Sequence, residues 1–110
     1  MNIDFSKIEE TRTPNFKGGE KYYAARRYED GLNRITMGRL VPGASIGLHT
    51  HEDSSEIMFF TGGSGYVICD GERLPVSAGV VHYCPKGHSH TLVNDSSDAD
   101  LTFNAVVPIQ

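Results

Sequence analysis

Short apolar stretches separated by turn residues run from Tyr22 to the end of the chain. The turn signals recur roughly every 8–12 residues, a spacing typical of an all-β sandwich or barrel. The expected strands cover residues 22–28, 33–41, 56–60, 64–70, 73–76, 80–84, 90–94 and 100–107. No segment past residue 20 keeps an apolar period of 3.6 residues, so we expect no long helix there. Closure of these strands into a barrel would protect the edges of the sheet.

Glycine-containing turns separate the expected strands. Asp70-Gly71 joins two of them and is a favoured hairpin dipeptide, because both residue types tolerate a positive φ. Glu29-Asp30-Gly31 predicts a second hairpin earlier in the chain.

The first twenty residues have a different character, polar and rich in turn formers. The spacing of Ser6 and Glu9 resembles a capping box and predicts a single helical turn, which Pro14 soon interrupts. We expect residues 1–20 to form an arm against the barrel or a partner subunit, and residues 21–110 to form a single domain.

Composition narrows the class of protein further. A chain of 110 residues is long enough for one domain with its own core. The net charge of −4, spread over mixed charges, gives no reason to expect nucleic acid or an anionic membrane as a partner. The start of the chain lacks the features of a signal peptide, and no apolar run is long enough to span a membrane. We therefore expect a cytoplasmic location.

The two cysteines, Cys69 and Cys84, are too far apart for a C-x-x-C redox motif. We expect both to be buried, reduced thiols on strands. A redox role for Cys84, which precedes Pro85, is the lesser alternative.

One cluster of polar residues suggests metal chemistry. If the segment around His49 and His51 is extended, both imidazoles project to the same side, because residues two apart share a face. Glu56 begins the next apolar strand and shares a face with Met58 and Phe60, so its carboxylate should point inward. An inward carboxylate is costly unless a cation or hydrogen-bond donors compensate for it. A metal between Glu56 and the two histidines would do so.

Each of these residues also has a plainer interpretation. A His-x-His pair is usually two surface histidines, and a glutamate at the start of a strand is usually solvated. His90 begins the strand 90–94 and could supply a third imidazole, but alone it is more often a core or loop residue.

Two motifs with fixed spacing favour the metal-binding interpretation of these residues over the plainer one. They read Gly43-x5-His49-x-His51-x4-Glu56-x6-Gly63 and Gly79-x5-Pro85-x-Gly87-x2-His90-x3-Asn94. Both match the two motifs of the cupin superfamily at every fixed position, so the chain resembles a small bacterial single-domain cupin over residues 43–94. The resemblance implies a double-stranded β-helix, or jelly-roll, barrel.

The resemblance also implies a ligand set: His49, His51, Glu56 and His90 would bind one divalent transition metal inside the mouth of the barrel. Three nitrogens and one oxygen suit Mn, Fe, Zn, Ni, Co or Cu, and do not suit Ca or Mg. The motif glycines, Pro85 and Asn94 are interpreted as structural.

Cupins with this ligand set carry out several reactions, among them dioxygenation, decarboxylation, sugar isomerisation and lyase reactions. The resemblance therefore implies a metal-dependent enzyme acting on a small oxygen-rich molecule. The alternatives are a non-catalytic module that binds or senses a small molecule, and a domain whose metal only stabilises the barrel.

Residues that line a substrate pocket can be suggested only from the alternation of inward and outward positions along each strand. Met58 and Phe60 would form an apolar wall. His82 or Tyr83 is a weak candidate for acid–base work, and at most one of them faces inward because they are adjacent. Candidates for binding a substrate carboxylate, each with surface exposure as the plainer expectation, are Arg26, Arg34 and Arg39.

A homodimer is also expected. Ile57 and Phe59 alternate outward from Glu56, which would leave an apolar sheet face exposed. The arm of residues 1–20 could cross to the partner.

Overall fold

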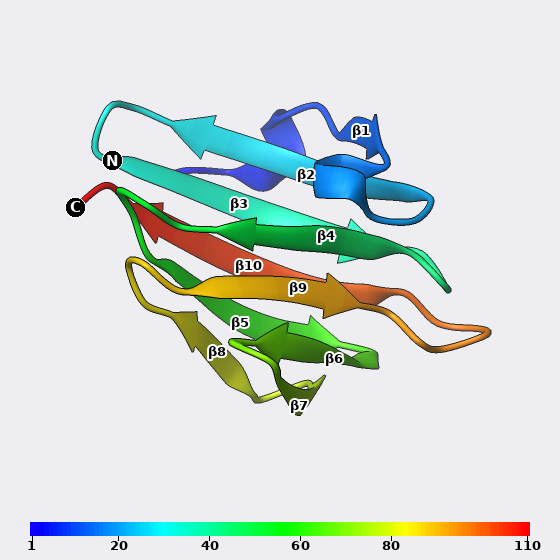
Figure 1. The fold of residues 1–110 in the computed structure, drawn as a ribbon. Coiled ribbons are helices and arrows are strands. Elements are labelled where there is room, and N and C mark those ends of the chain that lie inside the picture. Colours follow the sequence, from blue (N-terminus) through cyan, green and yellow to red (C-terminus); the bar gives the residue numbers. More distant parts are fainter.

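A computed structural model describes all 110 residues. Two antiparallel sheets face each other, with strand orders β1-β2-β3-β10-β5-β8 and β4-β9-β6-β7 (Figure 1). The elements are η1 (Phe5–Lys7), β1 (Thr11–Pro14), η2 (Phe16–Gly18), β2 (Tyr22–Glu29), β3 (Asn33–Leu40), β4 (Ser45–Thr50), β5 (Glu56–Gly62), β6 (Ser64–Cys69), β7 (Glu72–Ser77), β8 (Val81–Cys84), β9 (Ser89–Val93) and β10 (Leu101–Pro108). Neither of the two short 3-10 helices has the length or apolar character needed to cross a bilayer.

Every strand expected from the sequence is present, and two more are added. β4 carries His49 and ends at Thr50, so the backbone is extended at His49, as the metal-site prediction required. β1 lies within residues 1–20, where it extends the larger sheet by pairing antiparallel with β2. The expected helical turn is η1, but Asp4 rather than Ser6 caps it, since the Asp4 carboxylate accepts a hydrogen bond from the Ser6 backbone amide at 3.0 Å.

The core lies between the two sheets, where alternate residues of β3, β5, β8, β9 and β10 are buried. In β10 these residues are Leu101, Phe103, Ala105 and Val107. The Phe103 ring stacks on Tyr23 of β2 with 5.9 Å between ring centroids. This stacking fixes Tyr23 at the point where the core meets the cavity described below.

Gly38 of β3 makes that stacking possible. A Cβ atom at this position would lie 2.8 Å from atoms of both the Phe103 and the Tyr23 rings. Any larger residue would push the two rings apart, so the glycine sets the position of Tyr23.

A β-bulge in β4 aims His49 into the interior. Ile46 pairs with Leu92 of β9 and His49 pairs with His90, so three positions along β4 correspond to two along β9. An extra residue lets Ile46 and His49 face the same cavity although an odd number of positions separates them.

Close backbone contact places η2 over β4. A Cβ at Gly19 would lie 2.0 Å from the Ser45 carbonyl oxygen, and a Cβ at Gly47 would lie 1.9 Å from the Lys17 carbonyl oxygen. Glycine is therefore required on both sides of this contact. It holds η2 against the strand that carries His49.

Candidate metal centre

Four side chains from three strands and one loop converge at one end of the interior. His49 comes from β4, His51 from the residue just after it, Glu56 from the start of β5 and His90 from β9. The His90 Nε2 atom lies 3.1 Å from His49 Nε2, 3.0 Å from His51 Nε2 and 3.0 Å from Glu56 Oε1. The four candidate ligand atoms all lie within 4.8 Å of one another.

This spacing fits a transition metal. Metal–nitrogen and metal–oxygen bonds of about 2.0–2.2 Å place neighbouring ligand atoms roughly 3.0–3.4 Å apart in octahedral or tetrahedral geometry. The His51 Nε2 to Glu56 Oε1 distance of 3.3 Å lies in the same range. Three imidazole nitrogens and one carboxylate oxygen form a donor set that suits a divalent transition metal.

The second ring nitrogen of each candidate histidine has its own partner. His49 Nδ1 lies 2.8 Å from the Gly47 carbonyl oxygen, and His51 Nδ1 lies 3.1 Å from Ser54 Oγ. His90 Nδ1 lies 3.0 Å from His82 Nε2. With a metal bound, a proton on each Nδ1 could be donated outward, which would leave the Nε2 lone pairs directed at the metal.

His82 consequently has a different place from the one suggested by alternation alone. It faces inward and is only 6 % exposed, but it does not line the cavity. Burial, with the charge of His90, lowers the pKa of His82 to about 4, so the ring is neutral near pH 7 and its Nε2 can accept a hydrogen bond from His90 Nδ1. Tyr83 points outward and is 55 % exposed, so the structure does not place it at the site.

The ionisation of the cluster also suits a cation. Burial by itself would raise the pKa of Glu56, but hydrogen bonds from His51 and His90 outweigh it and bring the pKa to about 2. Burial lowers the pKa of His49. A carboxylate that stays ionised and an imidazole that stays neutral are the forms that bind metals.

The cluster opens onto a cavity of about 300 Å³. Met58 and Phe60 face inward as expected, but both belong to the core beneath the site and do not line the cavity. Its apolar wall is instead formed by Phe16, Tyr23, Ile46, Val107 and Ile109. The prediction for the wall was wrong because inward alternation does not show how deep in the barrel a residue lies.

Only one of the three suggested arginines reaches this cavity. Arg34 lines it, with a side chain that is 44 % exposed. Arg26 and Arg39 lie on the outer face of the larger sheet, where Arg26 donates a hydrogen bond to the Ile8 carbonyl oxygen and Arg39 pairs with Glu10.

Among the polar lining residues that sequence reasoning overlooked are Lys17, Tyr23 and Arg27. The signal for two of them was present, because Tyr23, Ala25 and Arg27 alternate along one strand. Lys17 could not have been found in this way, since it reaches the cavity only through the contact of η2 with β4.

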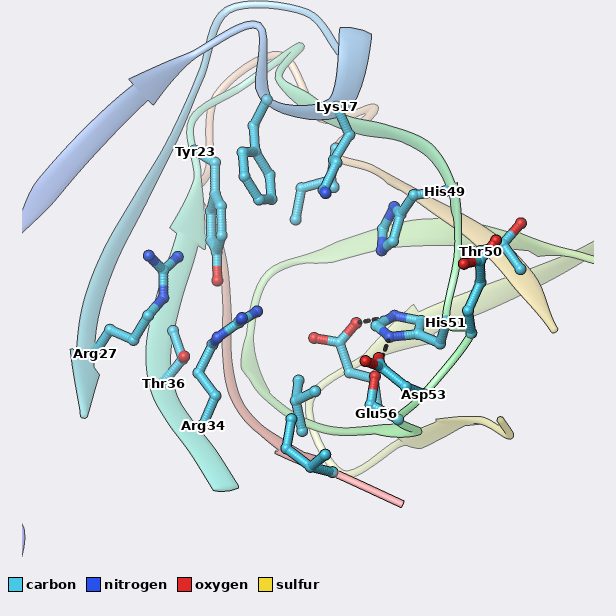
Figure 2. Close-up of a pocket in the computed structure, with 16 residues that line it drawn as sticks. Lys17, Tyr23, Arg27, Arg34, Thr36, His49, Thr50, His51, Asp53 and Glu56 are labelled. Atoms are coloured by element: carbon cyan, nitrogen blue, oxygen red, sulfur yellow. Dashed lines mark hydrogen bonds and ion pairs between the residues drawn. The ribbon is translucent and has the colours of Figure 1, made fainter. Parts of the chain in front are cut away.

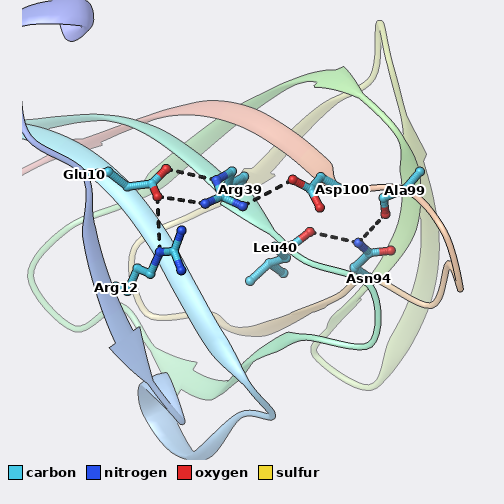
Figure 3. Close-up of polar contacts among 7 residues, drawn as sticks. All are labelled: Glu10, Arg12, Arg39, Leu40, Asn94, Ala99 and Asp100. Atoms are coloured by element: carbon cyan, nitrogen blue, oxygen red, sulfur yellow. Dashed lines mark hydrogen bonds and ion pairs between the residues drawn. The ribbon is translucent and has the colours of Figure 1, made fainter.

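Both cysteines are free thiols in the structure, as expected. Cys84 is fully buried, but Cys69 is only partly buried, so the prediction of two buried thiols was wrong for Cys69. Asn94 has the structural role that was assigned to it. Its side-chain amide donates to the Leu40 and Ala99 carbonyl oxygens at 2.9 Å each, and these bonds close the far end of the barrel (Figure 3).

Comparison with known proteins agrees with this geometry. Residues 36–107 match the Cupin_2 family, described as a cupin domain. The chain is 30 % identical to an oxalate-binding protein of Thermotoga maritima over 113 residues, which covers 97 % of this chain and 93 % of the relative. It is similar to the crystal structure of a predicted oxalate decarboxylase from the same organism, with a TM-score of 0.92, 30 % identity and full coverage of both chains. An RmlC-like cupin from Shewanella frigidimarina shares the fold, with a TM-score of 0.81 at 13 % identity over 98 % of this chain and 89 % of that one.

Proposed function

Since this chain belongs to the cupin family, we propose that it binds one divalent transition metal through His49, His51, Glu56 and His90 and presents that metal to a small carboxylate anion. The observation that carries the proposal is the convergence of four ligand atoms at the floor of a cavity that also holds cationic side chains. A bound metal supplies a positive centre that attracts and polarises carboxylate oxygens.

Oxalate is the first ligand to test. The relative from Thermotoga maritima is named for binding oxalate, and it aligns over almost the whole of this chain. The cavity of about 300 Å³ lies at the lower end of the range for small-molecule sites, in keeping with a compact anion.

A metal-dependent decarboxylase is the second candidate function. The similar Thermotoga maritima structure is described as a predicted oxalate decarboxylase, which favours this reaction over other cupin reactions. Release of carbon dioxide from oxalate by the metal-loaded protein would indicate an enzyme. Binding of oxalate without release would indicate a binding module.

Metal analysis tests the site directly. The wild type and His51→Ala are purified, loaded in turn with Mn, Fe, Co, Ni, Cu and Zn, and dialysed. We expect one equivalent of at least one metal in the wild type and almost none in His51→Ala. His88→Ala is the matched control, because His88 is an exposed turn histidine outside the cluster. Equal metal content in the wild type and His51→Ala would contradict the assignment.

We also propose that the chain forms a homodimer through the outer face of the larger sheet. Phe59 of β5 and Val81 of β8 are neighbours in register and are 46 % and 52 % exposed, with Tyr83 beside Ile57 in the next row. Light scattering should give the mass of a dimer for the wild type and of a monomer for Phe59→Lys. A monomeric wild type would contradict this.

A further inference from the structure

The wall of the cavity opposite the metal ligands carries two guanidinium groups. Arg27 of β2 and Arg34 of β3 line the cavity from neighbouring strands. Arg34 points toward Glu56 and His51, and the Arg27 guanidinium lies beside the Tyr23 hydroxyl (Figure 2). Arg34 Nε also pairs with Glu29 at 3.2 Å on the solvent side.

Arg27 lacks a partner for one of its donors. Its Nε atom is buried and forms no hydrogen bond within the protein. It is the one buried side-chain nitrogen or oxygen atom in the chain with this property. A buried donor without a partner normally costs stability, and such exceptions often mark functional positions.

The neighbouring Arg26 shows that an arginine in this part of β2 can find a hydrogen-bond partner. Arg26 faces the opposite side of the same strand and donates to the Ile8 carbonyl oxygen at 2.5 Å. Of two adjacent arginines, one is therefore paired with the fold, and the other lines the cavity and keeps one buried donor without a partner.

The Tyr23 hydroxyl is directed toward the guanidinium groups of Arg27 and Arg34 (Figure 2). Tyr23 is only 6 % exposed, and burial raises the pKa of its hydroxyl well above the usual range. Tyr23, Arg27, Arg34 and Glu56 all line the same cavity. Tyr23 thus keeps its proton and can donate it in a hydrogen bond to a ligand oxygen.

The charges of the site favour an anion with two negative ends. A divalent metal bound by one carboxylate leaves a net charge of +1 at the floor of the cavity. Arg27 and Arg34 add positive charge at the opposite wall, and the carboxylates of Glu52 and Asp53 are exposed at the rim. A monocarboxylate would neutralise only one of the two positive regions.

We propose that Arg27, with Arg34 and the Tyr23 hydroxyl beside it, forms a second anion subsite that makes this cavity selective for dicarboxylates over monocarboxylates. The proposal rests on the proposed function, since one carboxylate must occupy the metal. Arg27 is the main determinant of specificity, because its guanidinium can donate two hydrogen bonds to a carboxylate and has no competing acidic partner in the protein.

The test measures binding by calorimetry with metal-loaded wild type, Arg27→Met and Arg27→Lys. The probes are oxalate, malonate, succinate, acetate and inorganic phosphate. We expect the wild type to prefer at least one dicarboxylate to acetate by tenfold or more. Arg27→Met should lose about 10- to 100-fold in affinity for that dicarboxylate, keep its affinity for acetate and keep its metal content. Arg27→Lys should lose less, because it keeps the charge without the planar fork.

The control is Arg26→Met, which removes the neighbouring arginine from the outer face and should leave every affinity unchanged. Melting temperatures separate a ligand-binding role from a structural one. Because Arg27 forms no ion pair and its buried Nε has no partner, Arg27→Met should melt close to the wild-type temperature. Melting well below it in the metal-free protein would overturn the proposal in favour of a structural role.

The remaining outcomes distinguish the two proposals from each other. Two outcomes overturn only the subsite. In one, the wild type binds metal and carboxylates but does not prefer dicarboxylates. In the other, Arg27→Met binds dicarboxylates as tightly as the wild type does. Preference for phosphate over every dicarboxylate overturns the dicarboxylate assignment. A wild type that binds metal but no carboxylate overturns the proposed function itself.

Discussion

The two ends of the barrel interior are built from opposite chemistry. At one end, Leu40, Leu101 and Asn94 are completely buried, and the Asn94 side chain satisfies the backbone carbonyls that it meets. At the other end, imidazoles, a carboxylate and two guanidinium groups surround an open cavity. The same strands supply both ends, since β3 carries Arg34 at its start and Leu40 at its finish.

The difference shows how a chain of 110 residues holds such a costly polar site. Clustered imidazoles and an ionised carboxylate do not add stability by themselves, because their desolvation is unfavourable. The apolar end stabilises the fold, and because the same β-strands continue into the polar end, their packing also holds the polar residues in position. Mutations at the two ends should therefore separate stability from metal binding.

The largest effect is expected at the closed end. Leu101→Ala removes a completely buried side chain and should lower the free energy of unfolding by about 3 kcal/mol. The metal affinity of the folded protein should not change, because no ligand is moved. Urea denaturation and metal titration measure the two quantities. A parallel fall in metal affinity would show that the ends are not independent.

At the open end, His82→Phe should weaken metal binding about 10- to 100-fold, which corresponds to roughly 1.4–2.7 kcal/mol. The reason is the loss of the acceptor for His90 Nδ1, 3.0 Å away. His82→Gln, whose amide oxygen can accept the same hydrogen bond, should recover part of the affinity. Competition with a chelator of known affinity is the measurement, and unchanged affinity in His82→Phe would exclude a role in orienting His90.

Acid should destabilise the metal-free protein through the open end. The folded pKa of His82, about 4, lies below its ordinary value of 6.5, and burial shifts the pKa of His49 in the same direction. The neutral forms therefore stabilise the fold above pH 6.5, and this contribution is lost as the pH falls toward 4.

We expect a loss of about 1–2 kcal/mol from His82 over this range, seen as a lower urea midpoint. His82→Phe should show a smaller loss. Glu56 does not account for the change, because its pKa of about 2 lies below an ordinary value of 4.5, so its contribution is lost only at lower pH. Equal pH dependence in His82→Phe and the wild type would contradict the assignment.

The smallest effect is expected on the outer face of the larger sheet. There Arg39 contacts Glu10 through two hydrogen bonds of 2.9 and 2.7 Å and Asp100 at 3.3 Å, which ties the residues just before β1 and β10 to β3 (Figure 3). Because these groups are partly exposed, Arg39→Met should cost less than about 1 kcal/mol, and less still in high salt. Thermal melting at two salt concentrations measures this. A large loss that salt does not reduce would show that the network supports the fold more strongly than surface ion pairs usually do.

Much of the fold could be predicted from local pattern. Period-two alternation and turn residues placed eight strands, and the Asp70-Gly71 turn has the expected positive φ at both residues, 49° and 82°. β1 was not predicted because its four residues are polar, and they become a strand only by pairing with the edge of β2. An edge strand without an apolar face leaves no periodic signal in the sequence.

The candidate site was predictable in part. Alternation predicted that Glu56 points into the interior. The spacing of the two motifs grouped Glu56 with His49, His51 and His90, and the structure brings their ligand atoms together. Arg26 was predicted in place of Arg27 because alternation shows that Tyr23 and Arg27 share a face of β2 but not that this face is the inner one, which only packing decides.

The sequence by itself determined the strands, the turns and the residues able to bind a metal, because these depend on local conformation and on the chemistry of each side chain. Only the tertiary structure decided which side chains meet. It paired His82 with His90, turned His49 inward through a bulge in β4, and set Arg27 across the cavity from Glu56. The physical reason is that contacts between separate strands depend on register and on the packing of one sheet against the other, and neither is encoded within a single strand.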